Sequence, residues 1–151
     1  MHLLRTTSDN ADFQALVALL DQELRVRDGD EHAFFAQYNK LDNIKHVVVL
    51  YDQGQALGCG AFKEYEPGVA EIKRMYVATQ QRGLGIASQV LKELEAWAQE
   101  QGYRRLILET GIRQPEAIAL YGKAGYTSIP NFGQYAGVAS SRCFEKRLEI
   151  P

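Results

Sequence analysis

A glycine-containing stretch near the middle of the chain has the residue types of an anion-binding turn. The stretch Gln80–Leu91, QQRGLGIASQVL, places Arg82, Gly83 and Gly85 directly before a run with helical spacing. The first turn of a helix has unpaired N–H groups and the positive end of the helix dipole, and glycine lets a ligand approach the backbone closely. The sequence therefore predicts a phosphate or pyrophosphate site here, with Arg82 adding a positive charge.

Two common phosphate-binding motifs do not fit this stretch. A P-loop requires a lysine after its last glycine, whereas Ser88 and Gln89 stand here. A dinucleotide fingerprint would place its third small residue at Ser88, and the preceding strand belongs to a series of hairpins rather than to an opening βαβ unit. A general phosphate cradle remains, and the alternative is a tight turn that holds no ligand.

Composition and charge limit the function classes. The chain has 151 residues, a formal net charge of -2 and a sequence pI of about 5.9. We predict one domain over residues 1–151 and, because there is no basic excess, no nucleic-acid partner. The amino end turns polar early and no apolar run reaches the roughly 20 residues that cross a bilayer, so we expect a cytoplasmic protein without a membrane partner. Cys59 and Cys143 have no ligand or redox spacing, which favours two free thiols and no metal.

Alternating strand and helix patterns predict an α/β (α+β) fold with a mixed sheet and helices on both faces. The turn residues Asp52 to Gly54 and Glu66 to Gly68 separate three successive antiparallel strands. Strands are expected at Leu3–Thr6, His46–Tyr51, Ala56–Phe62, Val69–Val77, Arg104–Thr110, Tyr126–Ile129 and Arg142–Leu148. Helices are expected from the N-cap candidates Thr7–Asn10 to about Arg27, at Glu31–Leu41 and Gly83–Gln101, and within Gln114–Gly125, with Pro115 in the first turn and Gly125 just past the end.

Two motifs resemble those of the GNAT N-acetyltransferase family, in its small, single-domain bacterial type. The stretch VATQQRGLGIASQVL resembles the acyl-CoA-binding signature R/Q-x-x-G-x-G/A, with Arg82, Gly85 and Ala87 at the signature positions. Further on, LETGIRQPEAIALYGKAGY is similar to the second half of that fold, where a helix carrying A-x-x-L-Y packs beside the cofactor thiol. The resemblance implies a mostly antiparallel sheet of about six to seven strands flanked by about four helices. It also implies acetyl-CoA as co-substrate, without a metal, and acetyl transfer to a primary amine by direct attack in a ternary complex.

The resemblance further implies which residues hold the cofactor. The strand before the glycine turn should splay from its neighbour and pair its backbone with the pantetheine arm through Met75–Val77, and the N–H groups from Arg82 to Ala87 should meet the pyrophosphate. Many members have Asn where this chain has Gln114, whose longer amide can still donate to pantetheine. The complete predicted cofactor set is Met75, Tyr76, Val77, Arg82, Gly83, Leu84, Gly85, Ile86, Ala87, Gln114, Ala117 and Tyr121.

The predicted catalytic residues are Glu71 and Tyr121. Acyl transfer to an amine requires that the amine lose a proton and that the leaving thiolate gain one. Relatives place Glu or His at the position of Glu71, which implies a general base acting directly or through water; the alternative is a solvated or Lys-paired Glu on a strand edge. Relatives with A-x-x-L-Y place the phenol of Tyr121 beside the thioester sulfur, which implies a proton donor; the alternative is a core tyrosine bonded to a backbone carbonyl.

Strand alternation along Val69–Val77 predicts which side chains accompany Glu71. One face should carry Glu71, Lys73, Met75 and Val77, and the other should carry Ile72, Arg74 and Tyr76. Glu109 at a strand end and Tyr135 in a glycine-rich loop are weaker pocket candidates. The aromatic residues favoured as core rather than pocket are Phe34, Phe35 and Tyr38.

The acceptor is the least determined part of the prediction, because the amino-terminal third of such chains varies with substrate. Asp28, Asp30 and Glu31 could attract a cationic amine. A small amine is favoured, such as a polyamine, an amino acid or an aminoglycoside-like compound. The alternatives are a protein N-terminus or lysine as acceptor, and a non-catalytic acyl-CoA-binding sensor; a homodimer is left open.

Overall fold

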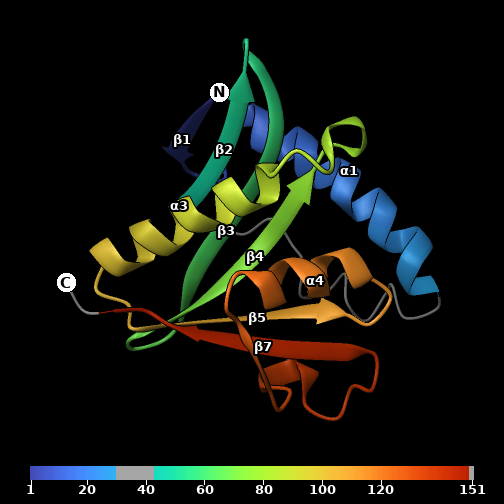
Figure 1. The fold of residues 1–151 in the computed structure, drawn as a ribbon, viewed down its shortest axis with the longest axis vertical. Helices are drawn as coiled ribbons and strands as arrows, with labels where there is room; N and C mark the ends of the chain where they lie inside the picture. The colour runs from blue at the N-terminus through green and yellow to red at the C-terminus, as the bar shows by residue number, and fades with distance from the viewer. Residues whose placement is uncertain (30–42, 150–151) are drawn as a thin grey trace.

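The elements follow one another along the chain in the order expected from the sequence (Figure 1). The structure is a computed structural model that describes residues 1–29 and 43–149. Its strands are β1 (His2–Thr6), β2 (His46–Asp52), β3 (Gln55–Glu66), β4 (Val69–Val77), β5 (Arg105–Gly111), β6 (Thr127–Ile129) and β7 (Ser141–Arg147). Its helices are α1 (Ala11–Asp28), α3 (Ile86–Glu100) and α4 (Pro115–Lys123), with short 3-10 turns η2 (Thr79–Gln81) and η3 (Gly133–Tyr135). The helix predicted at Glu31–Leu41, with Phe34, Phe35 and Tyr38, lies outside the described residues.

The strands form one mixed, mostly antiparallel sheet, as predicted. Its order is β1-β2-β3-β4-β5-β7-β6, and the β4–β5 pair is parallel. That pair is joined only over three residues of each strand, ending at Glu71 opposite Ile107. Beyond this point β4 continues to Val77 and β5 to Gly111, so the two strands lie together at their beginnings and apart at their ends (Figure 1). The predicted splay of the strand before the glycine turn is therefore present.

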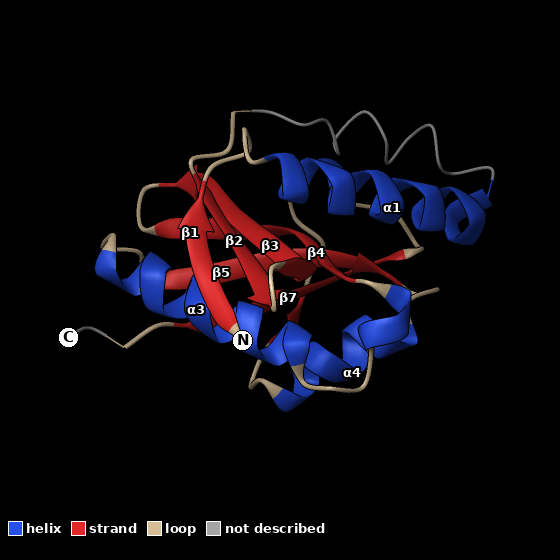
Figure 2. Cartoon of the chain, turned by 90° about the horizontal axis from the view of Figure 1, so that it is seen from above, coloured by secondary structure: helices blue, strands red, loops and turns tan. Residues whose placement is uncertain are grey.

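Helices cover both faces of the sheet, as predicted (Figure 2). The core on the α1 face is built around Phe13, Val17, Val47, Val49 and Ala61, and the core on the opposite face around Phe62, Val90, Leu94, Leu106 and Leu108. Cys59 and Cys143 are buried free thiols. Among the described residues, no helix is long and apolar enough to cross a membrane.

The helix after the glycine turn begins later than predicted. α3 begins at Ile86 rather than at Gly83. The reason is the backbone of the two glycines, since Gly83 has φ 85° and Gly85 has φ 77°, neither of which is helical. Gly102, with φ 90°, follows the end of α3 and stops it as predicted.

The predicted alternation along β4 is wrong in its second half. Cys59 pairs with Tyr76 but Ala61 pairs with Lys73, so β4 carries one more residue than β3 over this interval. Arg74 lies within this bulge and has φ 62°. Ile72 therefore faces the α3 core while Tyr76 faces the α1 core, although simple alternation puts them on one face.

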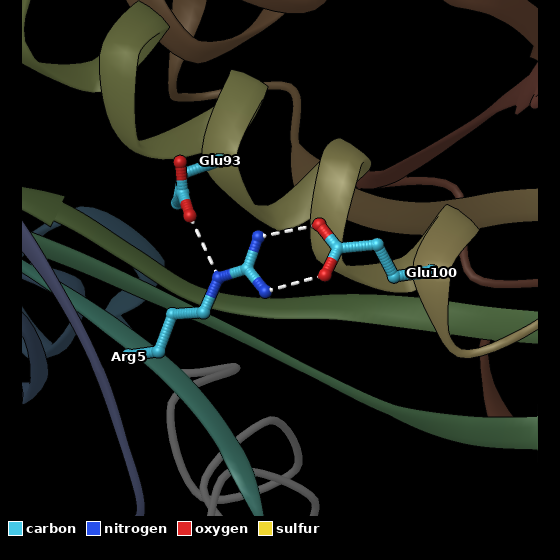
Figure 3. A network of polar contacts seen from close by, with 3 residues as sticks. All are labelled: Arg5, Glu93 and Glu100. Carbon is cyan, nitrogen blue, oxygen red and sulfur yellow. Dashed lines mark hydrogen bonds and ion pairs between the residues drawn. The ribbon is translucent and has the colours of Figure 1, made fainter.

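An arginine on the sheet edge fastens β1 to α3. Arg5 Nε donates to Glu93 Oε2 at 2.7 Å, and its two Nη atoms donate to the carboxylate of Glu100 at 2.8 and 2.7 Å (Figure 3). The guanidinium also lies 5.1 Å from the centre of the Trp97 ring. A bidentate arginine–carboxylate pair fixes orientation as well as charge, so these contacts help to set the position of α3 against the sheet.

Candidate active site

A cavity of about 370 Å³ opens where β4 and β5 separate. Every predicted site residue except Leu84 lines it, and Leu84 is 59% exposed. The lining members of the predicted set are Glu71, Met75, Tyr76, Val77, Arg82, Gly83, Gly85, Ile86, Ala87, Gln114, Ala117 and Tyr121. Residues from β4, the glycine turn, α3 and α4 are thus brought to one space, which the two sequence motifs alone could not show.

The glycine turn presents an uncapped helix end to open space. A side chain added at Gly83 or Gly85 would meet no atom within 4 Å. Gly85 is the N-cap of α3 and no side chain among the described residues caps this helix, whereas Asn10 caps α1 by accepting from the N–H of Phe13 at 2.8 Å. The first-turn N–H groups of α3 therefore keep the donor capacity that a phosphate would use.

Arg82 lies at the cavity mouth and is already engaged. Its Nη2 donates to Glu23 Oε2 at 2.6 Å, its Nε donates to the Val77 carbonyl oxygen at 3.1 Å, and its guanidinium lies 5.5 Å from the Tyr76 ring centre. The hydrogen bond that Arg82 donates to Glu23 raises the pKa of Arg82 above its ordinary value. Arg82 is thus a permanent cation that α1 holds beside the glycine turn.

An ion-pair chain continues from Glu23 across the mouth of the cavity. Arg27 Nη2 lies 3.0 Å from Glu23 Oε1, and Arg27 Nη1 also pairs with Glu116 in the first turn of α4. Glu23 and Glu116 line the cavity together with Arg82. These ion pairs link α1 to α4; the Glu23–Arg27 pair has the i,i+4 spacing of a helix, whereas the contacts with Arg82 and Glu116 join segments far apart in the sequence.

Within residues 1–29 and 43–149, main-chain groups at the end of β4 have no strand partner on the β5 side. Pairing stops at Glu71, and the following segment Met75–Val77 borders the cavity. An extended ligand can add to such an edge in the manner of a strand. The Val77 carbonyl oxygen is the acceptor that Arg82 already uses.

Glu71 lies at the point where the two strands separate. It is only 4% exposed, and Lys73 Nζ lies 3.4 Å from its Oε2. Of the alternatives for Glu71, the lysine pair is present, whereas the solvated strand-edge position is not. The carboxylate faces the cavity and is available to a group bound there.

Tyr121 is the buried residue of α4 and also lines the cavity. Its ring lies 5.6 Å from that of Tyr126 and 6.3 Å from that of Phe144. Burial, and then the nearby charge of Glu109, raise the pKa of Tyr121, and no hydrogen bond joins its hydroxyl to another residue of the described chain. The predicted alternative, a phenol bonded to a backbone carbonyl, is not what the described residues show. The hydroxyl therefore remains a protonated donor at neutral pH.

The two weaker candidates, Glu109 and Tyr135, both line the cavity. Ser141 Oγ donates to Glu109 Oε2 at 2.7 Å. Tyr135 is 3% exposed, and its pKa is raised by burial first and then by the charges of Glu109 and Glu71. Tyr135 thus brings the loop between β6 and β7 to the same cavity as Glu109 and Glu71.

Other lining residues were missed by the sequence reasoning. Leu20 and Leu24 of α1 have ordinary core spacing, and nothing local indicates which end of α1 meets the cavity. Lys73 and Arg74 line the cavity together because of the bulge, for which the sequence gives no signal. Asp30 and Glu31 lie outside the described residues. Within the described ranges, no group of three or more His, Cys, Asp or Glu side chains could hold a metal ion.

Comparisons with known proteins agree with this geometry. The profile of the Acetyltransferase (GNAT) family matches residues 13–126. An IAA acetyltransferase of Azospirillum brasilense is 40% identical over 102 residues, which are 67% of this chain and 67% of that protein. An uncharacterized N-acetyltransferase of Bacillus subtilis is 33% identical over 100 residues, which are 65% of this chain and 66% of that protein.

A solved structure extends the likeness over nearly the whole chain. A Klebsiella pneumoniae protein named as an acyl-CoA N-acyltransferase is 34% identical and superposes with a TM-score of 0.81, covering 98% of this chain and 97% of that one. The seven-stranded sheet with its separated β4 and β5 is accordingly that of an acyl-CoA N-acyltransferase. The chain belongs to the GNAT family of acetyltransferases.

Proposed function

We propose that the protein transfers the acetyl group of acetyl-CoA to a primary amine of a small molecule, by direct attack in a ternary complex. The observation that carries the proposal is that one cavity is lined both by the glycine turn before α3 and by the buried carboxylate of Glu71. A cofactor bound at the turn can therefore extend its thioester toward a group that accepts a proton. Membership of the GNAT family supports the same reaction.

The cofactor end of the cavity fits a pyrophosphate and an extended arm. The uncapped N–H groups after Gly85, together with Arg82, would bind the pyrophosphate. Met75–Val77 pairs with β3 on one edge, and its other edge, toward β5, would pair with the pantetheine arm, whose other side would meet Gln114 and Ala117. Arg82 and the N–H groups supply positive charge and donors for an anion, and the β4 edge supplies backbone hydrogen-bonding groups for an amide-containing chain. All of these residues line the same cavity.

The chemistry assigned to the site balances in protons. The amine nitrogen attacks the thioester carbonyl carbon, so that a C–N bond forms and the C–S bond breaks. The proton of the attacking amine passes to Glu71, directly or through water, and the leaving thiolate takes a hydrogen bond and then a proton from Tyr121. Glu71 then releases its proton to solvent, and solvent returns a proton to Tyr121, whose raised pKa favours the phenol over the phenolate.

The test is thiol release from acetyl-CoA with a panel of acceptors. The panel contains primary amines of several classes and peptides with a free N-terminus or a lysine. It also contains IAA, because the Azospirillum brasilense relative is named an IAA acetyltransferase. Release above the hydrolysis rate with a small amine supports the proposal. Release with peptides alone would assign a protein acetyltransferase, and acetyl-CoA binding without any acceptor-dependent release would assign a sensor.

A further inference from the structure

The acceptor end of the cavity has cations on one strand and a carboxylate on the facing strand. Lys73 and Arg74 follow the last paired residue of β4, and Glu109 follows that of β5. All three line the cavity. The strands separate after Glu71 and Ile107, so β4 carries both cations with Glu71 beside Lys73, and β5 carries Glu109 on the other wall.

The bulge in β4 is what places two cations on one wall. In a regular strand, Lys73 and Arg74 would point to opposite faces. Here Ile72 faces the α3 core, which puts the next side chain, Lys73, on the α1 face, and Arg74 Nη1 lies 3.2 Å from Asp21 Oδ1 of α1, so both cations lie on the α1 face. The extra residue of the bulge thus adds a second positive charge beside the predicted thioester position.

Arg74 is an unusual residue for this position in two respects. Its φ of 62° lies in the left-handed region that non-glycine residues rarely adopt, and its side chain is only 3% exposed. Residues held in such conformations concentrate at functional sites. Its partner Asp21 does not line the cavity and has a side chain that is 43% exposed, so Arg74 is the member of the pair that faces the cavity.

We propose that the acceptor is an amino acid, or a similar molecule that carries a carboxylate close to its primary amine. The inference rests on the proposed N-acetyltransferase function. The carboxylate binds the cavity side of the Arg74 guanidinium, which keeps its Nη1 contact with Asp21, and Lys73 lies nearby in its pair with Glu71. The amine then lies toward Glu71 and Glu109, where it loses its proton and attacks the thioester. A polyamine would set positive charge against Arg74 and Lys73, and such like-charge contact disfavours it.

The wild-type enzyme tests this by comparing each of several L-amino acids with its α-carboxamide in the thiol-release assay. We expect kcat/KM to be about 10- to 100-fold higher for the acid, the factor that a hydrogen-bonded charge pair supplies. The α-amine of the carboxamide is less basic and more often neutral, which works against the expected result. Equal or higher kcat/KM for carboxamides or polyamines would overturn the inference, as would the absence of amino-acid turnover.

Two variants assign the preference to Arg74. Arg74→Gln should lower kcat/KM for the acid by about tenfold or more and leave that for the carboxamide nearly unchanged, while Arg74→Lys should keep part of the preference. A general loss of folding lowers both values equally and leaves their ratio intact, so an unchanged ratio in Arg74→Gln contradicts the assignment. Failure of the proposed function itself is different, because then no amine of any class releases thiol.

Discussion

Replacing Tyr121 by Phe removes one buried hydroxyl and leaves the aromatic packing of α4 in place. The ring keeps its contacts with Tyr126 and Phe144 at 5.6 and 6.3 Å between centroids. No hydrogen bond within the described chain is broken, so we expect the free energy of unfolding to change by less than about 1 kcal/mol. The variant therefore isolates the contribution of the hydroxyl to the reaction.

The size of the effect follows from what the hydroxyl would contact. A hydrogen bond to a charged group such as a thiolate contributes about 1.5 to 3 kcal/mol. Each 1.4 kcal/mol or so is a factor of ten in rate, so kcat should fall about 10- to 150-fold. The interaction develops only as the thiolate leaves, and acetyl-CoA affinity should therefore stay within about twofold of wild type.

The assay is single-turnover acetyl transfer, in which chemistry rather than product release determines the rate. Tyr126→Phe is the matched control, because Tyr126 is a neighbouring buried tyrosine that does not line the cavity and whose hydroxyl donates to Glu95 Oε2 at 2.8 Å. Tyr126→Phe should lower the free energy of unfolding without lowering the rate of acetyl transfer. A wild-type rate in folded Tyr121→Phe would refute the role of the hydroxyl, and equal slowing in both variants would point to packing instead.

Three further predictions concern the base, the cavity mouth and pH. Glu71→Gln should lower kcat at least about tenfold with little change in acetyl-CoA affinity, and an unaltered pH–rate profile in that variant would remove Glu71 from the mechanism. Glu23→Gln removes the 2.6 Å ion pair with Arg82 and a negative charge near the proposed pyrophosphate site. Calorimetry at low salt should therefore give about two- to tenfold tighter acetyl-CoA binding. Weaker binding would mean that Glu23 positions Arg82 for the ligand. Burial raises the pKa of Cys59 from 9.0 to about 12, so its contribution to the free energy of unfolding is complete below pH 9 and is lost as the pH rises toward 12. Denaturant titrations from pH 8 to about 11 should show this loss as a fall in the free energy of unfolding with rising pH. That fall should be smaller in Cys59→Ala, and an equal fall in both proteins would contradict the prediction.

Local patterns predicted most of the fold because local chemistry determines most of its elements. The β-branched run His46–Tyr51 and the turns on either side of Val69–Val77 produced the expected hairpins. The register error at Arg74 has a different origin, since a bulge is decided by pairing between strands and leaves no signal within one of them. The late start of α3 follows from the left-handed backbone of Gly85, which the sequence permits but does not require.

The residues that line the cavity were predictable where a motif is continuous and unpredictable where the lining is assembled from distant segments. The glycine turn and Tyr121 each lie in a recognisable stretch, and both line the cavity. Glu23 reaches Arg82 from α1 across 59 positions of sequence, and such a contact follows only from the packing of α1 on the sheet. Arg74 lines the cavity only because a bulge turns it there.

The central claim is that the turn before α3 binds the pyrophosphate of acetyl-CoA, and calorimetry on two matched glycine variants tests it most directly. Gly85 and Gly102 lie at opposite ends of α3, have φ of 77° and 90°, and would each place a new Cβ in open space. Gly85→Ala and Gly102→Ala therefore have a similar backbone cost, on the order of 1 kcal/mol, but only the first sets a methyl group where the phosphate would lie. We predict that Gly85→Ala weakens acetyl-CoA binding about tenfold or more while Gly102→Ala binds as wild type does. Equal affinity in the two folded variants would contradict the account and place the pyrophosphate elsewhere.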